Sequence, residues 1–179
     1  MTGKLFERLS DGAHKLGFYV VRFNWRFFTN KTEPSEGLKT EAEDLSLILD
    51  HYSKRSGINR DTRVLASKSI GTRIAMLGPS DKVTANLLLT PNCSAENRFR
   101  DTYDPIYRQK TPAHIVISST DPYCDISQIY GALKDFGSRV TIHTLSGDHN
   151  FVIGGPASTM NEDAAIQSSL NWLNVIRKP

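Results

Sequence analysis

A serine between two small residues lies where an apolar run gives way to a helical pattern. Residues 67–71 read Ser-Lys-Ser-Ile-Gly, which matches the pattern small-x-Ser-x-Gly with Ser67 and Gly71 in the small positions. A serine at the tip of a strand sits in a strained turn, and its neighbours two before and two after must be small for strand and helix to pack closely. Ser69 is therefore the candidate nucleophile, and the backbone N–H of Ile70, at the start of the helix, can stabilise an oxyanion.

The same pattern has a structural explanation. Ser67 or Ser69 would serve equally well as the N-cap of an ordinary helix, because a serine oxygen accepts a hydrogen bond from the free N–H groups of the first turn. The pattern alone is therefore a weak signal. Its position between an apolar run and a helix is what favours the nucleophile interpretation.

A candidate acid and a candidate base follow two later apolar runs. Asp121 comes shortly after the run at residues 114–118, and His149 comes shortly after the run at residues 140–145. If both runs are strands of one parallel sheet, each side chain lies at a carboxyl end and the chain order is serine, acid, histidine. We expect His149 to remove the proton of Ser69, while Asp121 orients the imidazole ring and stabilises the imidazolium.

Other titratable residues compete for these roles. Asp125 and Asp148 are the alternative acids, although Asp148 adjoins His149 and neighbouring side chains on a loop usually diverge. Asp121 precedes a proline, so it also fits an ordinary turn. No two histidines have a metal-like spacing, so we expect no metal and no cofactor. Four histidines on predicted helices or strands are interpreted as structural or solvent-facing: His14, His51, His114 and His143.

The positions of the candidate residues depend on an alternation of two kinds of segment. Apolar, β-branched runs that are typical of buried parallel strands occur at residues 18–23, 63–66, 83–89, 114–118 and 140–145. Helical spacing of apolar residues occurs at 4–15, 40–56, 126–136 and 157–176. This alternation predicts an α/β fold with three α/β/α layers and a mainly parallel sheet of about five strands. Residues 29–37 and 92–111 are polar and are predicted to be loops.

Composition sets limits on domain number and partners. The chain of 179 residues has 39% hydrophobic and 23% charged residues, which predicts a single globular domain over 1–179. The net charge is +3 with scattered Lys and Arg, so no nucleic-acid partner is predicted. No stretch approaches the ~18 apolar residues of a membrane span, and no apolar leader follows Met1, so we expect no membrane partner and a cytoplasmic location. Cys93 and Cys124 are expected to be reduced, buried thiols.

Four segments together resemble a known family. Residues 16–23, 67–73, 121–123 and 147–151 are similar to the small predicted α/β hydrolases related to dienelactone hydrolase, and the likeness spans nearly the whole chain. The resemblance implies a reduced α/β-hydrolase fold. It also implies a nucleophile, acid and base at Ser69, Asp121 and His149, and a small-molecule ester or related acyl compound as substrate.

The start of the chain departs from that family. Such proteins have strands before the first helix, and a loop leaving one of them supplies the second N–H of the oxyanion hole. This chain begins with the helix, which would leave a central strand position empty and backbone groups unpaired. Three outcomes are open: the 18–23 strand shifts to pair directly, another chain fills the gap, as in a homodimer through the exposed sheet edge, or the chain is truncated. In each case an incomplete oxyanion hole would cost ~10²–10³ in rate.

Three functions remain open from the sequence. The first is a serine hydrolase that cleaves a small ester, thioester or related acyl bond through an acyl-enzyme. The second is a catalytically inactive protein of the same fold with an interaction role or none. The third is a nucleotide-binding domain, which is disfavoured because the segment at 23–28 is aromatic and lacks the glycines of a phosphate loop.

Overall fold

A computed structural model describes residues 3–55, 62–93, 99–153 and 159–177. Its centre is a sheet of four parallel strands in the order β1–β2–β3–β4. These strands are Val64–Ser69, Ala85–Pro91, Ala113–Ser118 and Val140–Leu145. Every residue of β2 and β3 is buried, as expected for inner strands that helices cover on both faces.

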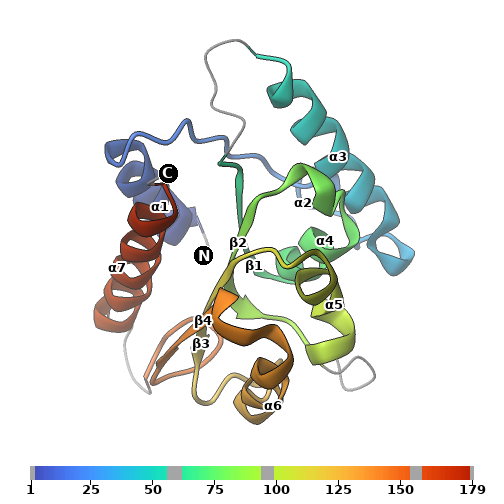
Figure 1. Ribbon diagram of the computed structural model, residues 1–179. Coiled ribbons are helices and arrows are strands. Elements are labelled where there is room, and N and C mark those ends of the chain that lie inside the picture. The colour runs from blue at the N-terminus through green and yellow to red at the C-terminus, as the bar shows by residue number, and fades with distance from the viewer. Residues whose placement is uncertain (1–2, 56–61, 94–98, 154–158, 178–179) are drawn as a thin grey trace.

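Helices cover the two faces of the sheet (Figure 1). On one face α1 (Gly3–Lys15) and α7 (Thr159–Ile176) pack together on Leu87, Leu89 and Val116. On the other face α4 (Ile70–Leu77), α5 (Phe99–Gln109) and α6 (Ile126–Phe136) pack on Leu88 and on residues of β3. The alternation of Leu87, Leu88 and Leu89 between the two cores follows from the two-residue period of a strand. The predicted three-layer α/β/α architecture is confirmed.

Smaller elements lie outside these layers. Helix α3 (Lys39–Ser53) packs against α4 through a core that contains Leu45 and Ile74. Helix α2 (Arg26–Asn30) precedes it. Three short 3₁₀ helices span Glu36–Leu38, Ser80–Lys82 and Gly137–Arg139. No helix in the described part of the chain is long and apolar enough to cross a membrane.

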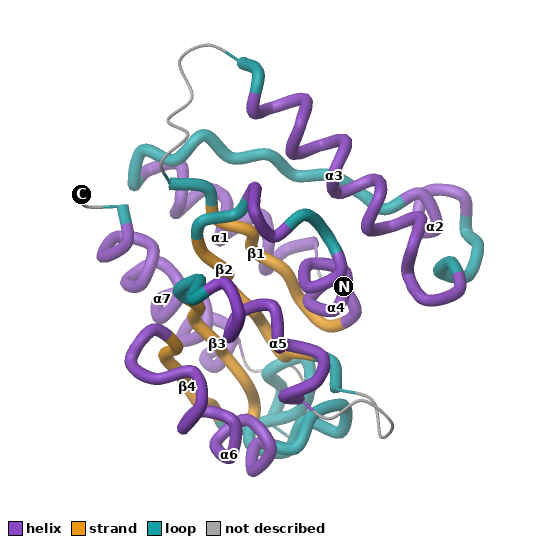
Figure 2. The backbone as a smooth tube through the Cα atoms, turned by 45° about the vertical axis from the view of Figure 1, so that its right-hand side comes forward, coloured by secondary structure: helices purple, strands orange, loops and turns teal. Residues whose placement is uncertain are grey.

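The predicted strand at residues 18–23 is wrong. This segment is an extended connection between α1 and α2, drawn as a loop in Figure 2. Between residues 19 and 24 no backbone hydrogen bond to another segment is found among the described residues, and β1 is left as an edge strand. Phe18 and Val20 pack on the α1–α7 core, whereas Trp25 packs on the α3 core. The apolar character of the segment therefore reflects side-chain packing and not pairing in the sheet. In the described ranges the sheet has four strands instead of about five.

The loop predicted at residues 92–111 contains a helix. Phe99, Tyr103 and Ile106 are spaced as on one face of a helix and are almost fully buried in α5. Charged neighbours and Pro105, within the helix, obscure that spacing in the sequence. The segment at 94–98 of this predicted loop lies outside the described residues.

The expectation of two reduced thiols is also wrong. Cys93 and Cys124 form a disulfide. The first lies just beyond β2 and the second lies in the connection after β3. Because β2 and β3 are neighbours in the sheet, the residues that follow their carboxyl ends meet, although they are 31 positions apart in the sequence. Disulfides are rare in reducing compartments, so this bond weakens the argument for a cytoplasmic location.

Candidate active site

Ser69 lies at the turn between β1 and α4. Its backbone has φ +54° and ψ −128°, a conformation that an L residue rarely adopts. A Cβ atom on Gly71 would lie 3.7 Å from the Cβ of Ser67, so the two small positions face one another across the turn. That distance is ordinary van der Waals contact for a Cβ, so atoms beyond Cβ at either position would crowd the other, in agreement with the steric requirement of the pattern.

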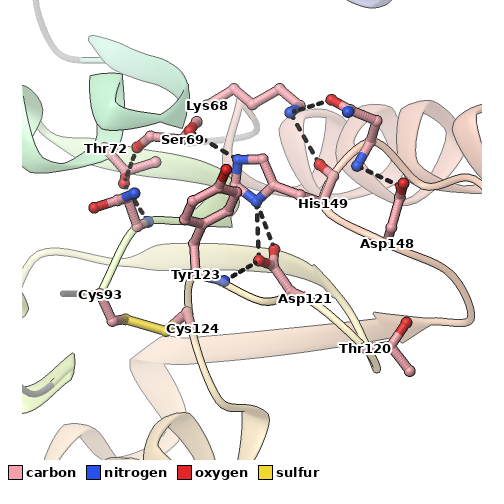
Figure 3. A network of polar contacts seen from close by, with 12 residues as sticks. Lys68, Ser69, Thr72, Cys93, Thr120, Asp121, Tyr123, Cys124, Asp148 and His149 are labelled. Atoms are coloured by element: carbon pink, nitrogen blue, oxygen red, sulfur yellow. Dashed lines mark hydrogen bonds and ion pairs between the residues drawn. A yellow bond between two sulfur atoms is a disulfide. The ribbon is translucent and has the colours of Figure 1, made fainter. Parts of the chain in front are cut away.

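Ser69, His149 and Asp121 form a continuous hydrogen-bonded chain (Figure 3). Ser69 Oγ lies 2.7 Å from Nε2 of His149. Nδ1 of the same ring lies 2.9 and 2.8 Å from the two carboxylate oxygens of Asp121. The side chain of Asp121 is fully buried and that of His149 is 11% exposed. The structure thus brings together the three residues that the sequence proposed as nucleophile, base and acid.

Backbone contacts hold Asp121 in place. Its Oδ1 accepts a hydrogen bond of 2.9 Å from the backbone N–H of Tyr123, two residues later. The ring of Tyr123 meets the imidazole of His149 edge-on, with centroids 4.6 Å apart. The disulfide at Cys124 then links the same loop to the end of β2. The loop around Asp121 therefore fixes its side chain independently of the contact with His149.

The loop of His149 is held by Asp148 and Gly147. Asp148 Oδ1 accepts hydrogen bonds from the backbone N–H groups of Asn150 and Val152, and Asp148 N–H donates to the carbonyl of Val152. Gly147 has φ +113°, and a Cβ atom there would lie 2.8 Å from the carbonyl oxygen of Val152. Asp148 is thus used within its own loop, which argues against it as the partner of His149.

The second competing acid, Asp125, lies at the start of α6. Its Oδ1 accepts a hydrogen bond of 2.8 Å from the backbone N–H of Ser127, in the manner of an N-cap. Hydrogen bonds from the backbone and side chain of Ser127 lower the pKa of Asp125. Asp125 therefore stabilises a helix end and does not contact His149.

A buried network of hydrogen bonds supports the turn at Ser69. Thr72 Oγ1 donates to the carbonyl of Ser69 at 2.6 Å and lies 2.5 Å from the hydroxyl of Tyr103. The N–H of Asn92 also donates to Thr72 Oγ1. Burial raises the pKa of Tyr103 far above its usual value, so the phenol stays protonated. Ile70 is the first residue of α4, so its N–H has no acceptor within the helix and remains available to an oxyanion.

Sequence reasoning missed three residues around this site. Thr72 and Tyr103 carry no recognisable motif, and Tyr103 belongs to the helix that was predicted to be a loop. Lys68 occupies the variable position of the serine pattern, yet its ammonium group lies 3.0 Å from the carbonyl oxygen of His149. A variable position in a pattern gives no reason to expect such a contact.

The remaining histidines stay apart from the site. His114 is buried between β3 and α7, where it contacts Thr141 Oγ1 and Ser168 Oγ and stacks on Trp172. Burial lowers the pKa of His114 to about 4, and the nearby His143 adds to that shift.

No cluster of three or more metal-ligating side chains occurs among the residues that the structure describes.

Comparisons with known proteins identify the architecture. No protein-family model matches the chain, and no curated protein matches its sequence. The fold is similar to the esterase domain of a Rhodothermus marinus protein, with a TM-score of 0.71, 14% identity, and coverage of 96% of this chain and 80% of that one. It is also similar to a putative hydrolase of the alpha/beta superfamily from Xanthomonas campestris pv. campestris, with a TM-score of 0.67, 16% identity and coverage of 94% and 88%.

A third solved structure, an alpha-beta serine hydrolase homologue from Coxiella burnetii, has a TM-score of 0.65 and 21% identity over 97% of this chain and 76% of its own. At these identities the likeness shows the fold alone. What the individual residues do must be argued from the geometry of the site.

Proposed function

We propose that this chain, which has a reduced α/β-hydrolase fold, is a serine hydrolase that cleaves a small ester, thioester or related acyl bond. One observation carries the proposal, namely the chain of contacts from Ser69 Oγ through the imidazole of His149 to the buried carboxylate of Asp121. A serine that merely caps a helix needs neither a base within hydrogen-bonding distance nor a third group that orients the base.

The geometry supports the following sequence of steps. Nε2 of His149 accepts the proton of Ser69 as Oγ attacks the carbonyl carbon of the substrate. The carbonyl π electrons move to oxygen, and the N–H of Ile70 stabilises the resulting oxyanion. When the tetrahedral intermediate collapses, the bond to the alcohol or thiol breaks and His149 protonates the leaving group. Water, activated by the same imidazole, then hydrolyses the acyl-enzyme and restores Ser69.

Asp121 has an electrostatic role in these steps. A carboxylate with both oxygens on Nδ1 keeps a hydrogen on that nitrogen and leaves Nε2 free to accept the serine proton. Because the side chain is buried, its negative charge is weakly screened and stabilises the imidazolium strongly. No cofactor enters this chemistry.

The experiment is active-site labelling. A fluorophosphonate probe should label the folded wild-type protein at Ser69 and should not label Ser69→Ala, as mass spectrometry of the modified peptide would show. Ser119→Ala is a matched control, because Ser119 is exposed just beyond the end of β3 and, among the described residues, no hydrogen bond joins its side chain to His149 or Asp121. A well-folded wild-type sample in which no serine reacts would contradict the proposal.

One observation favours a second candidate, a catalytically inactive protein of this fold. Within the described residues β1 has no strand partner on its outer edge. In the family that the sequence resembles, a strand near that edge leads into the loop with the second oxyanion N–H. Ester turnover that disappears in both Ser69→Ala and His149→Ala would eliminate this candidate.

The free edge of β1 also supports the proposal of a homodimer, since an unpaired strand edge is a template for pairing. Light scattering at several protein concentrations would test it. A mass of one chain at all concentrations would overturn it.

A further inference from the structure

Lys68 has a buried position beside the candidate nucleophile. It is the last but one residue of β1 and is only 9% exposed. Its side chain runs past Ser69 toward the loop of His149, as Figure 3 shows. There Nζ donates hydrogen bonds to the carbonyl oxygen of His149 at 3.0 Å and to Oδ1 of Asn150 at 3.3 Å. A lysine is rarely buried unless its ammonium has such partners.

These contacts are the main polar connection between β1, which carries Ser69, and the loop at residues 146–152, which carries His149. Apart from the bond to Ser69, the other hydrogen bonds that the structure describes for the 146–152 loop stay within the loop or go to Thr120, Asp121 and Asn161, none of which belongs to β1. Among the described residues, β1 reaches this loop through the two bonds of Lys68 and through the bond from Ser69 to His149. The bond to Ser69 must rearrange in every turnover, whereas the bonds of Lys68 need not.

The charges around Lys68 suit a lasting contact. Burial lowers the pKa of Lys68, and the carboxylates of Asp121 and Asp148 oppose that shift. A positive group there also offsets the buried negative charge of Asp121. The ammonium is therefore held by its two hydrogen bonds, while the carboxylates of Asp121 and Asp148 favour its charge from a greater distance.

We propose that Lys68 is a positioning residue, whose ammonium group ties the backbone of His149 to the nucleophile strand and so holds the imidazole within hydrogen-bonding distance of Ser69. The effect on rate rests on the proposed hydrolase function, but the positioning is a property of the folded chain. Because a misplacement of about 1 Å in a catalytic group can cost ~10²-fold in rate, loss of this tie lowers kcat more than it changes KM.

The kinetic experiment compares four variants. Lys68→Met keeps the aliphatic stem and removes the charge and donors, Lys68→Arg keeps both, and Asn150→Ala removes one acceptor. Lys82→Met is the control, since it makes the same substitution at a more exposed lysine that forms an ion pair with Asp50. For Lys68→Met we expect kcat and the fluorophosphonate labelling rate to fall by about 10- to 100-fold with KM within about twofold. Lys68→Arg should recover part of the loss, Asn150→Ala should lose about two- to fivefold, and the control should match wild type.

A second readout does not depend on activity. In ¹⁵N NMR spectra, the ring signals of His149 should be single and sharp in wild type, with a slowly exchanging Nδ1 hydrogen, and should broaden or split in Lys68→Met. If Lys68→Met keeps the wild-type kcat and ring signals, the positioning role is overturned.

The two readouts also separate this proposal from the proposed function. If no serine of wild type reacts, the hydrolase proposal fails, while the ring signals still decide what Lys68 does. Should Lys68→Met fail to fold, Lys68→Arg and Asn150→Ala give the same two readouts. The proposal would be contradicted if Asn150→Ala kept the wild-type labelling rate and ring signals while Lys68→Arg lost labelling completely. Such a result would show that hydrogen bonds donated by residue 68 do not position His149.

Discussion

Asp121 presents both carboxylate oxygens to Nδ1 of His149, at 2.9 and 2.8 Å, from a side chain with no exposed surface. This arrangement places the hydrogen of the neutral imidazole on Nδ1 and turns the lone pair of Nε2 toward Ser69. The same carboxylate also accepts the N–H of Tyr123, so its orientation does not depend on the histidine.

Replacing Asp121 with Asn should therefore preserve the fold and remove most of the activity. An amide can donate to Nδ1 and trap the wrong tautomer, and it cannot stabilise an imidazolium. We expect kcat for ester hydrolysis to fall by about 10³- to 10⁴-fold, with a small change in thermal stability. Asp125→Asn is the matched control, because Asp125 caps α6 and does not contact the ring. A loss of similar size in the control would show that the effect is structural.

Replacing Gly147 with Ala should destabilise the loop of His149. Gly147 has φ +113°, and the added Cβ would lie 2.8 Å from a backbone oxygen. We expect a loss of about 2–4 kcal/mol in the free energy of unfolding, measured with urea, and lower activity. Gly131→Ala is the contrast, since nothing lies within 4 Å of its Cβ and it sits within α6. That variant should gain about 0.5–1 kcal/mol, because alanine favours helices.

Breaking the disulfide should loosen the loop that carries Asp121. Removal of the cross-link in Cys93→Ser with Cys124→Ser should cost about 2–4 kcal/mol of stability, chiefly by freeing the unfolded chain. Reduction of the wild-type protein with a dithiol should give a similar fall in the midpoint of unfolding. A thiol assay of the native, unreduced protein should find no free cysteine, and detection of two would contradict the bond.

Stability should fall as acid is added because His114 is buried in its neutral form. Its pKa is about 4 in the folded protein against 6.5 for an ordinary histidine, so the unfolded chain binds a proton first. Stability is therefore complete above pH 6.5 and declines as the pH falls toward 4, by on the order of 3 kcal/mol from this group. The unfolding free energy of His114→Gln should depend less steeply on pH over that interval. Equal slopes for His114→Gln and wild type would refute the assignment.

The sequence was informative where local pattern and tertiary structure agree. Val140–Leu145 and Ile126–Phe136 occupy the predicted positions, because buried runs and helical spacing there follow from the same apolar faces. The order of Ser69, Asp121 and His149 after successive strands also predicted that the three would meet. The alternation of segments implied parallel strands, whose carboxyl ends lie on the same side of the sheet. It did not show that the loop after β4 reaches past β2 and β3 to Ser69 at the end of β1.

The errors arise where a residue's partner lies far away in the sequence. Phe18 and Val20 have the composition of a strand but pack against helices, and composition does not distinguish these two environments. The bond between Cys93 and Cys124 depends on strand order, and the contact of Lys68 with His149 joins residues 81 positions apart. None of these relationships leaves a local signal in the sequence.

The sheet also has a consequence for how the molecule assembles. Its strands lie side by side in the order in which they are synthesised, from β1 to β4. Ser69 ends the first strand, and His149 comes 80 residues later, after the last. A nascent chain therefore contains Ser69 long before His149 is made, and on the proposed function partly folded forms that lack a docked β4 should not react with the probe. The rate at which probe labelling recovers during refolding would therefore measure the docking of β4, the last step of the pathway, and would not report on earlier steps.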